Sequence, residues 1–85
     1  AKDLVVAPNP IGVDGIAVVE YTWSFEEQDG LRVEIINSLG QRVDVFEPKS
    51  YPIVLPRVGG AGIYYVRITT GVGSVYVGKL IVEDR

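Results

Sequence analysis

Alternation of apolar and polar residues along the chain predicts a series of short strands and no helix. In the clearest example, Leu31, Val33 and Ile35 are expected to face a core. Arg32 and Glu34 alternate with them and are expected to face solvent. No segment combines apolar residues at i, i+3, i+4 and i+7 with helix caps, so an essentially helix-free fold is expected. The predicted strands cover residues 3–7, 16–25, 31–36, 41–47, 51–55, 63–70 and 74–83. In the strand at 63–70, Tyr64, Val66 and Ile68 are expected to share one face, with Arg67 on the other.

The same pattern predicts a hairpin between the third and fourth strands. Its turn is expected at Asn37-Ser38-Leu39-Gly40, in which Asn37 and Gly40 would supply positive φ angles. Val43 and Val45 are expected to face the core from the second strand of the hairpin. Their neighbours would face solvent and help to fix the register through opposite charges. The expected cross-strand pairs are Arg32 with Asp44 and Glu34 with Arg42.

Aromatic residues alternate along the second predicted strand. Tyr21, Trp23 and Phe25 are expected to share the inner face of a sheet, in line with Val19. The polar run that follows, Glu26-Glu27-Gln28-Asp29-Gly30, is expected to be a solvated turn.

Two other strands carry signs of their position in a sheet. Pro52 and Pro56 bracket the fifth strand, which suits a sheet edge because proline donates no hydrogen bond to a neighbour. The last strand is apolar on both faces, as a central strand or one that awaits a partner would be. Its residues Val75, Val77 and Ile81 oppose Tyr76, Leu80 and Val82. A free edge on this strand would let another chain add a strand to the sheet.

Seven short strands in 85 residues fit two packed sheets, so we predict an all-β, immunoglobulin-like antiparallel β-sandwich. A single domain, residues 1–85, accounts for the whole chain. Because the chain starts with Ala1-Lys2-Asp3 and not with methionine, we expect it to be excised from a larger protein. Every apolar run falls short of the roughly 20 residues that a transmembrane helix needs.

The composition excludes several functions. With no His and no Cys, the chain can form no Ser-His or Cys-His nucleophile, no zinc site of the usual ligands and no disulfide. Its net charge of −3 is a poor match for nucleic-acid phosphates or an anionic membrane surface. We therefore expect a protein that is not an enzyme, needs no cofactor and binds no nucleic acid.

Two kinds of segment resemble ligand sites but have simpler interpretations. Gly59-Gly60-Ala61-Gly62 and Gly71-Val72-Gly73 lack both the GxGxxG spacing and the lysine of a phosphate loop, so a flexible loop and a hairpin turn are expected. Glu26, Glu27 and Asp29 cluster as calcium ligands do, but they lack the spaced ligand series of an EF-hand. A solvated turn is the expected role of this cluster.

Five short motifs follow one another along the chain. They are Pro8-Asn9-Pro10, the hairpin from Val33 to Val43, Leu55-Pro56, Gly62-Ile63-Tyr64-Tyr65-Val66-Arg67-Ile68 and Lys79-Leu80-Ile81-Val82-Glu83. In this order, from Val6 to Glu83, they resemble the C-terminal sorting domain of cargo proteins of the type IX (Por) secretion system of Bacteroidetes. Ala7 departs from the family pattern, which commonly has an aromatic or other bulky residue at this position.

The resemblance implies a targeting role. A domain of this family is recognised in the periplasm by the outer-membrane translocation machinery, and a sortase often removes it and attaches the cargo to anionic lipopolysaccharide. The implied partners are therefore the translocon and the attachment complex, with self-association through a strand edge as a further expectation. The implied localisation is the periplasm in transit, then the outer membrane, the cell surface or the medium. The residues that match the family signature are Pro8, Asn9, Pro10, Gly40, Arg42, Gly62, Tyr64, Lys79, Leu80, Ile81, Val82 and Glu83.

Several of these residues have expected roles. The terminal strand is the expected contact with the machinery, with Lys79 and Glu83 as polar partners beside an apolar ridge. Asn9, held between two prolines, is expected to cap backbone groups locally. Gly40 and Gly62 are expected to be turn and strand-entry glycines.

A carbohydrate-binding or spacer module of an extracellular enzyme is the alternative interpretation. An exposed coplanar row of aromatic rings would favour it, and Tyr51, Tyr65 and Tyr76 are the candidates. A smooth polar surface with a prominent last strand would favour the sorting role.

Overall fold

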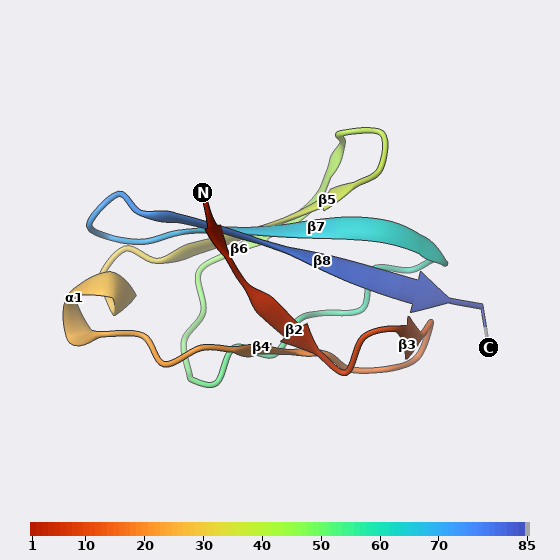
Figure 1. Ribbon diagram of the computed structural model, residues 1–85, viewed down its shortest axis with the longest axis horizontal. Coiled ribbons are helices and arrows are strands. Elements are labelled where there is room, and N and C mark those ends of the chain that lie inside the picture. The colour runs from red at the N-terminus through yellow and green to blue at the C-terminus, as the bar shows by residue number, and fades with distance from the viewer. Residues whose placement is uncertain (85) are drawn as a thin grey trace.

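The computed structural model describes residues 1–84, which form two β-sheets packed face to face and one short helix, α1 (Phe25–Gln28) (Figure 1). From edge to edge, the larger sheet runs β1 (Lys2–Asp3), β8 (Val75–Glu83), β7 (Gly62–Thr69), β5 (Arg32–Asn37) and β6 (Arg42–Phe46), and β3 (Ile11–Gly12) also pairs with β8. The smaller sheet pairs β2 (Val5–Ala7) with β4 (Val18–Glu20). The all-β sandwich expected from the sequence is confirmed.

The N-terminal segment crosses from one sheet to the other. β1 runs parallel to β8 in the larger sheet, whereas β2 runs antiparallel to β4 in the smaller sheet. The strand predicted at residues 3–7 is therefore two strands, and β3, which was not predicted, adds a second parallel pair with β8. These parallel pairs depart from the purely antiparallel expectation. Side-chain alternation identifies an extended segment but not the sheet that it joins.

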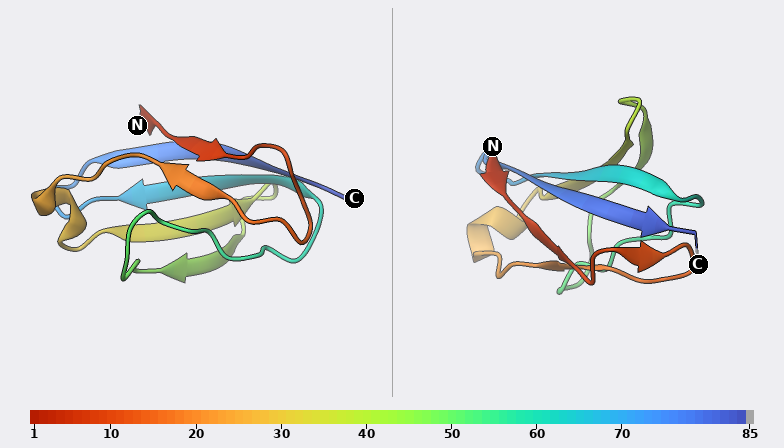
Figure 2. Two further views of the ribbon diagram at one scale, coloured as in Figure 1. Left: turned by 90° about the horizontal axis from the view of Figure 1, so that it is seen from below. Right: turned by 45° about the vertical axis from the view of Figure 1, so that its right-hand side comes forward.

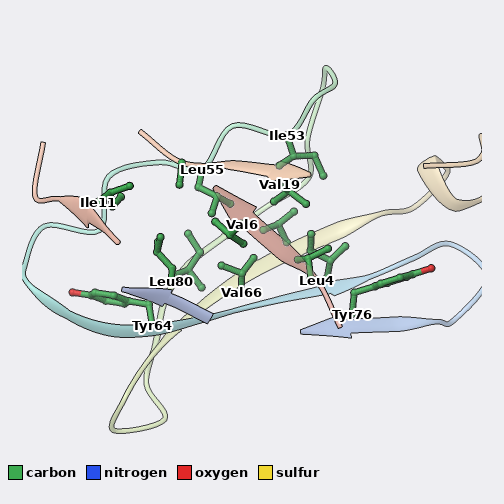
Figure 3. Close-up of a cluster of buried hydrophobic side chains, with 14 of the residues drawn as sticks. Leu4, Val6, Ile11, Val19, Ile53, Leu55, Tyr64, Val66, Tyr76 and Leu80 are labelled. Atoms are coloured by element: carbon green, nitrogen blue, oxygen red, sulfur yellow. The ribbon is translucent and has the colours of Figure 1, made fainter. Parts of the chain in front are cut away.

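The core lies between the two sheets, where side chains from both layers meet (Figure 3). Val33, Ile35, Val66 and Ile68 of the larger sheet are fully shielded from solvent. The smaller sheet contributes Val6 and Val19, and the residues just before its two strands contribute Leu4 and Ala17. The segment that follows β6 adds Ile53 and Leu55. The inward alternation predicted for β5 and β7 is confirmed. Tyr76, Leu80 and Val82 of β8 are buried as well, and the opposite residues of that strand are only partly covered.

The expectation of an essentially helix-free chain was wrong at Ser24–Gln28. Ser24 accepts a hydrogen bond from the Glu27 backbone amide at 3.2 Å, and the Glu27 carboxylate accepts one from the Ser24 amide at 3.0 Å. This capping box starts a single helical turn, which is too short to produce a helical period in the sequence. The predicted strand 16–25 is correspondingly reduced to Val18–Glu20, and Phe25, expected to face inward, is 89% exposed.

A β-bulge overturns the orientation predicted for β6. Ile35 lies opposite Asp44, whereas Ile36 lies opposite Arg42, so β6 holds one extra residue at this point. Val43 and Val45 are consequently exposed. Because a shift of one residue exchanges the two faces of a strand, a single bulge was enough to invert the prediction.

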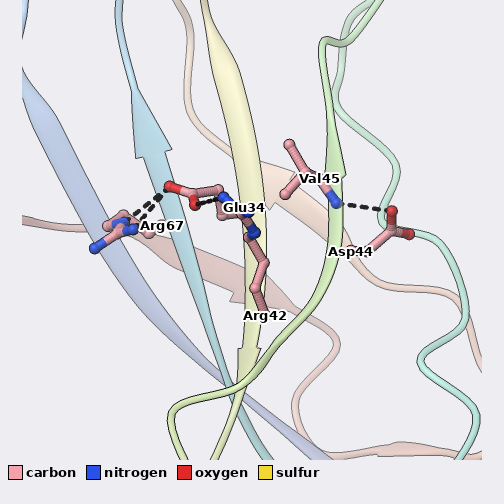
Figure 4. A network of polar contacts seen from close by, with 5 residues as sticks. All are labelled: Glu34, Arg42, Asp44, Val45 and Arg67. Atoms are coloured by element: carbon pink, nitrogen blue, oxygen red, sulfur yellow. Dashed lines mark hydrogen bonds and ion pairs between the residues drawn. The ribbon is translucent and has the colours of Figure 1, made fainter.

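The charged pairs predicted across the hairpin are half confirmed. The Arg42 guanidinium lies 3.1 Å from the Glu34 carboxylate, but Asp44 faces Ile35 and not Arg32. Arg67 of the neighbouring strand donates two further hydrogen bonds to Glu34, at 2.9 and 3.0 Å (Figure 4). Burial opposes ionisation of Glu34, but the hydrogen bonds from Arg67 and Arg42 outweigh it and hold its pKa below the ordinary value.

Two turn and edge predictions are also refined. Gly40 has a φ of +84°, as predicted, but the φ of Asn37 is not positive. The side-chain oxygen of Asn37 instead accepts hydrogen bonds from the backbone amides of Leu39 and Gln41. The strand predicted at residues 51–55 is reduced to a bridge between Val54 and Val18. This bridge lies at the edge of the smaller sheet, on the side of β4 away from β2, and an edge position is what the flanking prolines predicted.

Candidate recognition site

Asn9 joins the two ends of the chain. Its side-chain amide donates a hydrogen bond to the Lys79 carbonyl at 2.6 Å, and its side-chain oxygen accepts one from the Ile81 amide at 2.9 Å. Pro8 and Pro10 lie on either side, exposed, and both are preceded by cis peptide bonds. The expected local cap was therefore wrong, because Asn9 bonds to the backbone of β8, 70 and 72 residues further along the chain.

The edge of β8 that faces away from β7 is covered along its length. Of the two alternatives that the sequence left open for the last strand, a central position is therefore confirmed and a free edge is not. β1 pairs with the beginning of β8, opposite Tyr76 and Val77, and the Leu4 amide continues this contact by donating to the Val77 carbonyl. Asn9 occupies the middle of the edge, and β3 pairs with Val82 and Glu83 at its end. The strand at the opposite edge of the larger sheet is β6.

Several signature residues gather around the C-terminal half of β8. Gly62 and Tyr64 lie opposite Val82 and Leu80 in the β7–β8 ladder. Tyr64 is buried, and its hydroxyl donates to the Gly60 carbonyl at 2.8 Å. The strand-entry position expected for Gly62 is confirmed, because β7 begins there with a φ of +152°.

The C-terminal signature divides between the interior and the surface. Leu80 and Val82 are 1% and 4% exposed and belong to the core. Lys79 and Glu83 are exposed on the opposite face, and Ile81 is half-buried there. A partner that meets the folded domain can therefore contact only the second group of side chains.

Arg42 lies far from Asn9 in sequence and in the sheet but shares a row with Lys79. In this row Lys79 lies opposite Tyr65, Tyr65 opposite Ile36, and Ile36 opposite Arg42. Directly opposed residues point to the same face, so both cationic signature residues occupy the side of the sheet that faces away from the core. Gly40 stands apart, in the turn of the hairpin between β5 and β6, which projects from the body in Figure 1.

The row of exposed tyrosines considered for carbohydrate binding is not formed. Tyr76 is buried against Tyr21 and Trp23, with ring centroids 5.0 and 5.1 Å away. Tyr65 lies on the outer face of the larger sheet. Tyr51, whose pKa is raised by burial, lines a pocket near Tyr21 and Trp23.

The buried tyrosine is linked to the helical turn. The Tyr76 hydroxyl donates to the Glu27 carboxylate at 2.9 Å and lies 3.0 Å from the Tyr21 hydroxyl. Hydrogen bonds with Tyr21 and Glu27 raise the pKa of Tyr76, and bonds from the Ser24 backbone and from Tyr76 lower the pKa of Glu27. These bonds anchor α1 to β8. Glu27, which was expected to lie in a solvated turn, therefore makes a structural contact with β8.

The acidic turn does not form a cluster suited to a metal ion. In residues 1–84 no three Asp or Glu side chains are grouped as metal ligands would be. Within the same residues, no helix is long and apolar enough to cross a membrane.

The contact between Glu34 and Arg67 is a further polar feature that the sequence analysis did not predict. Both residues occupy solvent-facing positions of predicted strands, and this shared face is the signal that the sequence contains. The pairing of β5 with β7, which places Glu34 directly opposite Arg67, depends on a chain reversal of more than 20 residues. No local pattern specifies that pairing.

Removing the Asn9 bridge is expected to loosen the edge of β8. The substitution Asn9→Leu removes both hydrogen bonds and should lower the free energy of unfolding by about 1–3 kcal/mol. Hydrogen exchange of the Ile81 amide should accelerate, because that amide loses its acceptor. Unchanged exchange at Ile81 would contradict the bridge.

The variant Asn9→Asp supplies an internal control. Its ionised carboxylate can accept from Ile81 but cannot donate to the Lys79 carbonyl. Repulsion between the aspartate oxygen and the Lys79 carbonyl oxygen raises the pKa of this aspartate in the folded state. The stability that the bond to Lys79 contributes is therefore present at low pH and is lost as the pH rises through that pKa. Partial recovery below about pH 4 is expected, because the protonated acid donates again.

Comparison of the chain with family models, curated proteins and solved structures gives no match.

Proposed function

We propose that the chain is a non-catalytic C-terminal sorting domain, recognised by the type IX secretion machinery for transport of its parent protein across the outer membrane. In this proposal the domain folds in the periplasm, and its partners are the translocon and the sortase or attachment complex. The parent protein is then attached to the cell surface, through anionic lipopolysaccharide, or is released.

The observation that carries the proposal is the bond network of Asn9. Pro8-Asn9-Pro10 and Lys79-Leu80-Ile81-Val82-Glu83 are the first and last motifs of the resemblance, and the Asn9 side chain joins them directly. Gly62 and Tyr64, from a third motif, pair with the same stretch of β8. Motifs that are weak when taken singly therefore belong to one structural unit, as expected for a signal that is read in the folded state.

The polar groups of the interior support a role without catalysis. Glu34 is the one buried carboxylate in the part of the chain that the structure describes, and two arginines hold it ionised. A carboxylate fixed in this way is unsuited to exchange protons as a general acid or base near neutral pH. The Tyr76 hydroxyl is engaged by Glu27 and has a raised pKa, which also removes it from proton transfer near neutral pH.

Fusion of residues 1–85 behind a periplasmic reporter tests the proposal in a bacterium that has the secretion system. The reporter is expected outside the cell, and a strain without the translocon pore should retain it in the periplasm. Protease accessibility in whole cells and reporter activity in the medium measure the outcome. If a folded fusion stays periplasmic in cells that export another cargo of the system, the proposal is wrong.

Truncation of the last strand is an unsuitable control for this test. Leu80 and Val82 are core residues, so deletion from Leu80 onwards removes buried surface and is expected to unfold the domain. Loss of export would then reflect loss of the fold and not of a contact. Substitutions of exposed side chains avoid this difficulty.

A further inference from the structure

The larger sheet has an outer face that turns away from the smaller sheet (Figure 2). Strand register assigns every second residue of β5, β7 and β8 to this face. A second row lies beside the Lys79–Arg42 row already described: Val77 lies opposite Arg67, Arg67 opposite Glu34, and Glu34 opposite Val45.

The outer face is more apolar than a solvated sheet face needs to be. An antiparallel sheet with one face in water normally carries polar side chains there. Here Ile63, Tyr65 and Val45 are 42%, 40% and 38% exposed, and the half-buried Val77 and Ile81 lie on either side of Lys79 along β8. Ile63 adjoins Ile81 and Tyr65 adjoins Ile36 across the strand ladders, and exposed apolar residues gathered in this way mark an interaction surface.

Charge is concentrated on the same face with a sign opposite to that of the chain. Its cationic residues are Arg32, Arg42, Arg67 and Lys79. Against these four stand three carboxylates, Glu34, Glu83 and Asp3, the last of which lies opposite Val77, and this leaves a formal charge of +1. The rest of residues 1–84 carries three cationic and eight acidic side chains, a formal charge of −5. The face is thus electropositive on an otherwise acidic domain.

Hydrogen bonds fix the orientation of the central charges. Arg67 and Arg42 lie on either side of Glu34 and share its carboxylate, and their side chains remain 46% and 54% exposed (Figure 4). Guanidinium groups held in place lose less conformational freedom when a partner binds. Two donors are therefore preorganised at the centre of the face, beside Tyr65 and Val45.

We infer that this outer face docks an acidic protein surface, and, as this rests on the proposed function, that the surface belongs to a component of the translocation machinery. Arginine and tyrosine around an apolar centre are enriched in protein interfaces, whereas lysine is depleted. Three of the four cationic residues here are arginines, and two of these are partly neutralised by Glu34. A binder of polyanions would instead present many unpaired cationic side chains.

Charge reversal in the export assay tests this inference. The double variant Arg32→Glu/Lys79→Glu changes two exposed side chains of the face. Lys49→Glu/Arg57→Glu is the matched control, because it changes the net charge equally at exposed positions outside the face. Export of the face variant is expected to fall by about tenfold or more, because like charges then oppose each other in the complex. Export of the control is expected to equal that of the wild type.

A second variant keeps the charges and tests the apolar centre. Tyr65→Ser should also reduce export, whereas Tyr51→Ser, at a tyrosine of similar exposure elsewhere on the surface, should not. Circular dichroism and urea unfolding of the purified chains confirm that each variant is folded. If the charge-reversed variant fails to fold, the comparison of Tyr65→Ser with Tyr51→Ser decides.

The outcomes separate the inference from the function on which it rests. Normal export of the folded face variants overturns the inference and leaves the sorting role intact. Retention of the wild-type fusion in cells that export another cargo overturns both. Cosedimentation of the wild-type chain with vesicles of phosphatidylcholine and phosphatidylglycerol in equal parts, lost in the face variant, assigns the face to a lipid surface and overturns the acidic protein partner.

Discussion

The substitution Ile35→Ala is expected to lower the free energy of unfolding by about 2–5 kcal/mol. Ile35 is fully buried at the centre of β5, where it lies opposite Val66 of β7. Alanine removes apolar contacts and leaves a cavity between the sheets, which strand pairing on both sides prevents from collapsing. Domains of this size are stabilised by only about 5–10 kcal/mol, so the loss is a large fraction of the total.

Urea denaturation followed by far-ultraviolet circular dichroism measures this loss. Ile16→Ala is the matched control, because the same atoms are removed from a side chain that is 57% exposed. Its effect should stay within about 0.5 kcal/mol. A difference of less than 1 kcal/mol between the two variants would place Ile35 outside the core.

The substitution Gly71→Ala is expected to destabilise the domain by about 3 kcal/mol or more. A Cβ atom at this position would lie 1.5 Å from the carbonyl oxygen of Asp29 and 2.7 Å from its carbonyl carbon. The obstacle is backbone, so no side-chain rotation relieves it. The turn after α1 would have to move away from the β7–β8 hairpin, with loss of the bond from the Gly71 amide to the Glu27 carbonyl.

Gly60→Ala controls for the change of residue type. The nearest atom to a Cβ at Gly60 is the Tyr64 hydroxyl at 3.8 Å, an ordinary contact distance. This variant should be neutral or slightly stabilising, because alanine restricts the unfolded chain. Similar unfolding midpoints in urea for Gly71→Ala and Gly60→Ala would refute the close approach of the two turns.

Much of the larger sheet could be predicted from the sequence. The alternation of Val33 and Ile35, and of Tyr64, Val66 and Ile68, located two of its strands and their inner faces. These strands are regular over six and eight residues, so the face to which each side chain points follows from its position in the alternation. The turn glycine Gly40 was equally readable, because its positive φ has a residue preference.

The candidate site was only partly predictable. The sequence singled out Asn9 and the last strand separately, and both belong to the site, but the bond between them could not be foreseen. The apolar residues on both faces of β8 predicted a strand that needs neighbours. They did not show that the N-terminal segment supplies one of these neighbours and thereby covers the edge.

The sequence by itself determined the strand content, the inward faces of regular strands and the absence of histidine and cysteine chemistry, because these depend on residue type and local spacing. Only the tertiary structure decided which strands are neighbours, where β6 shifts its register and which charges meet on the outer face. The physical reason is that strand pairing joins residues distant in the chain. Its energy depends on hydrogen bonds and packing between segments, which no local pattern contains.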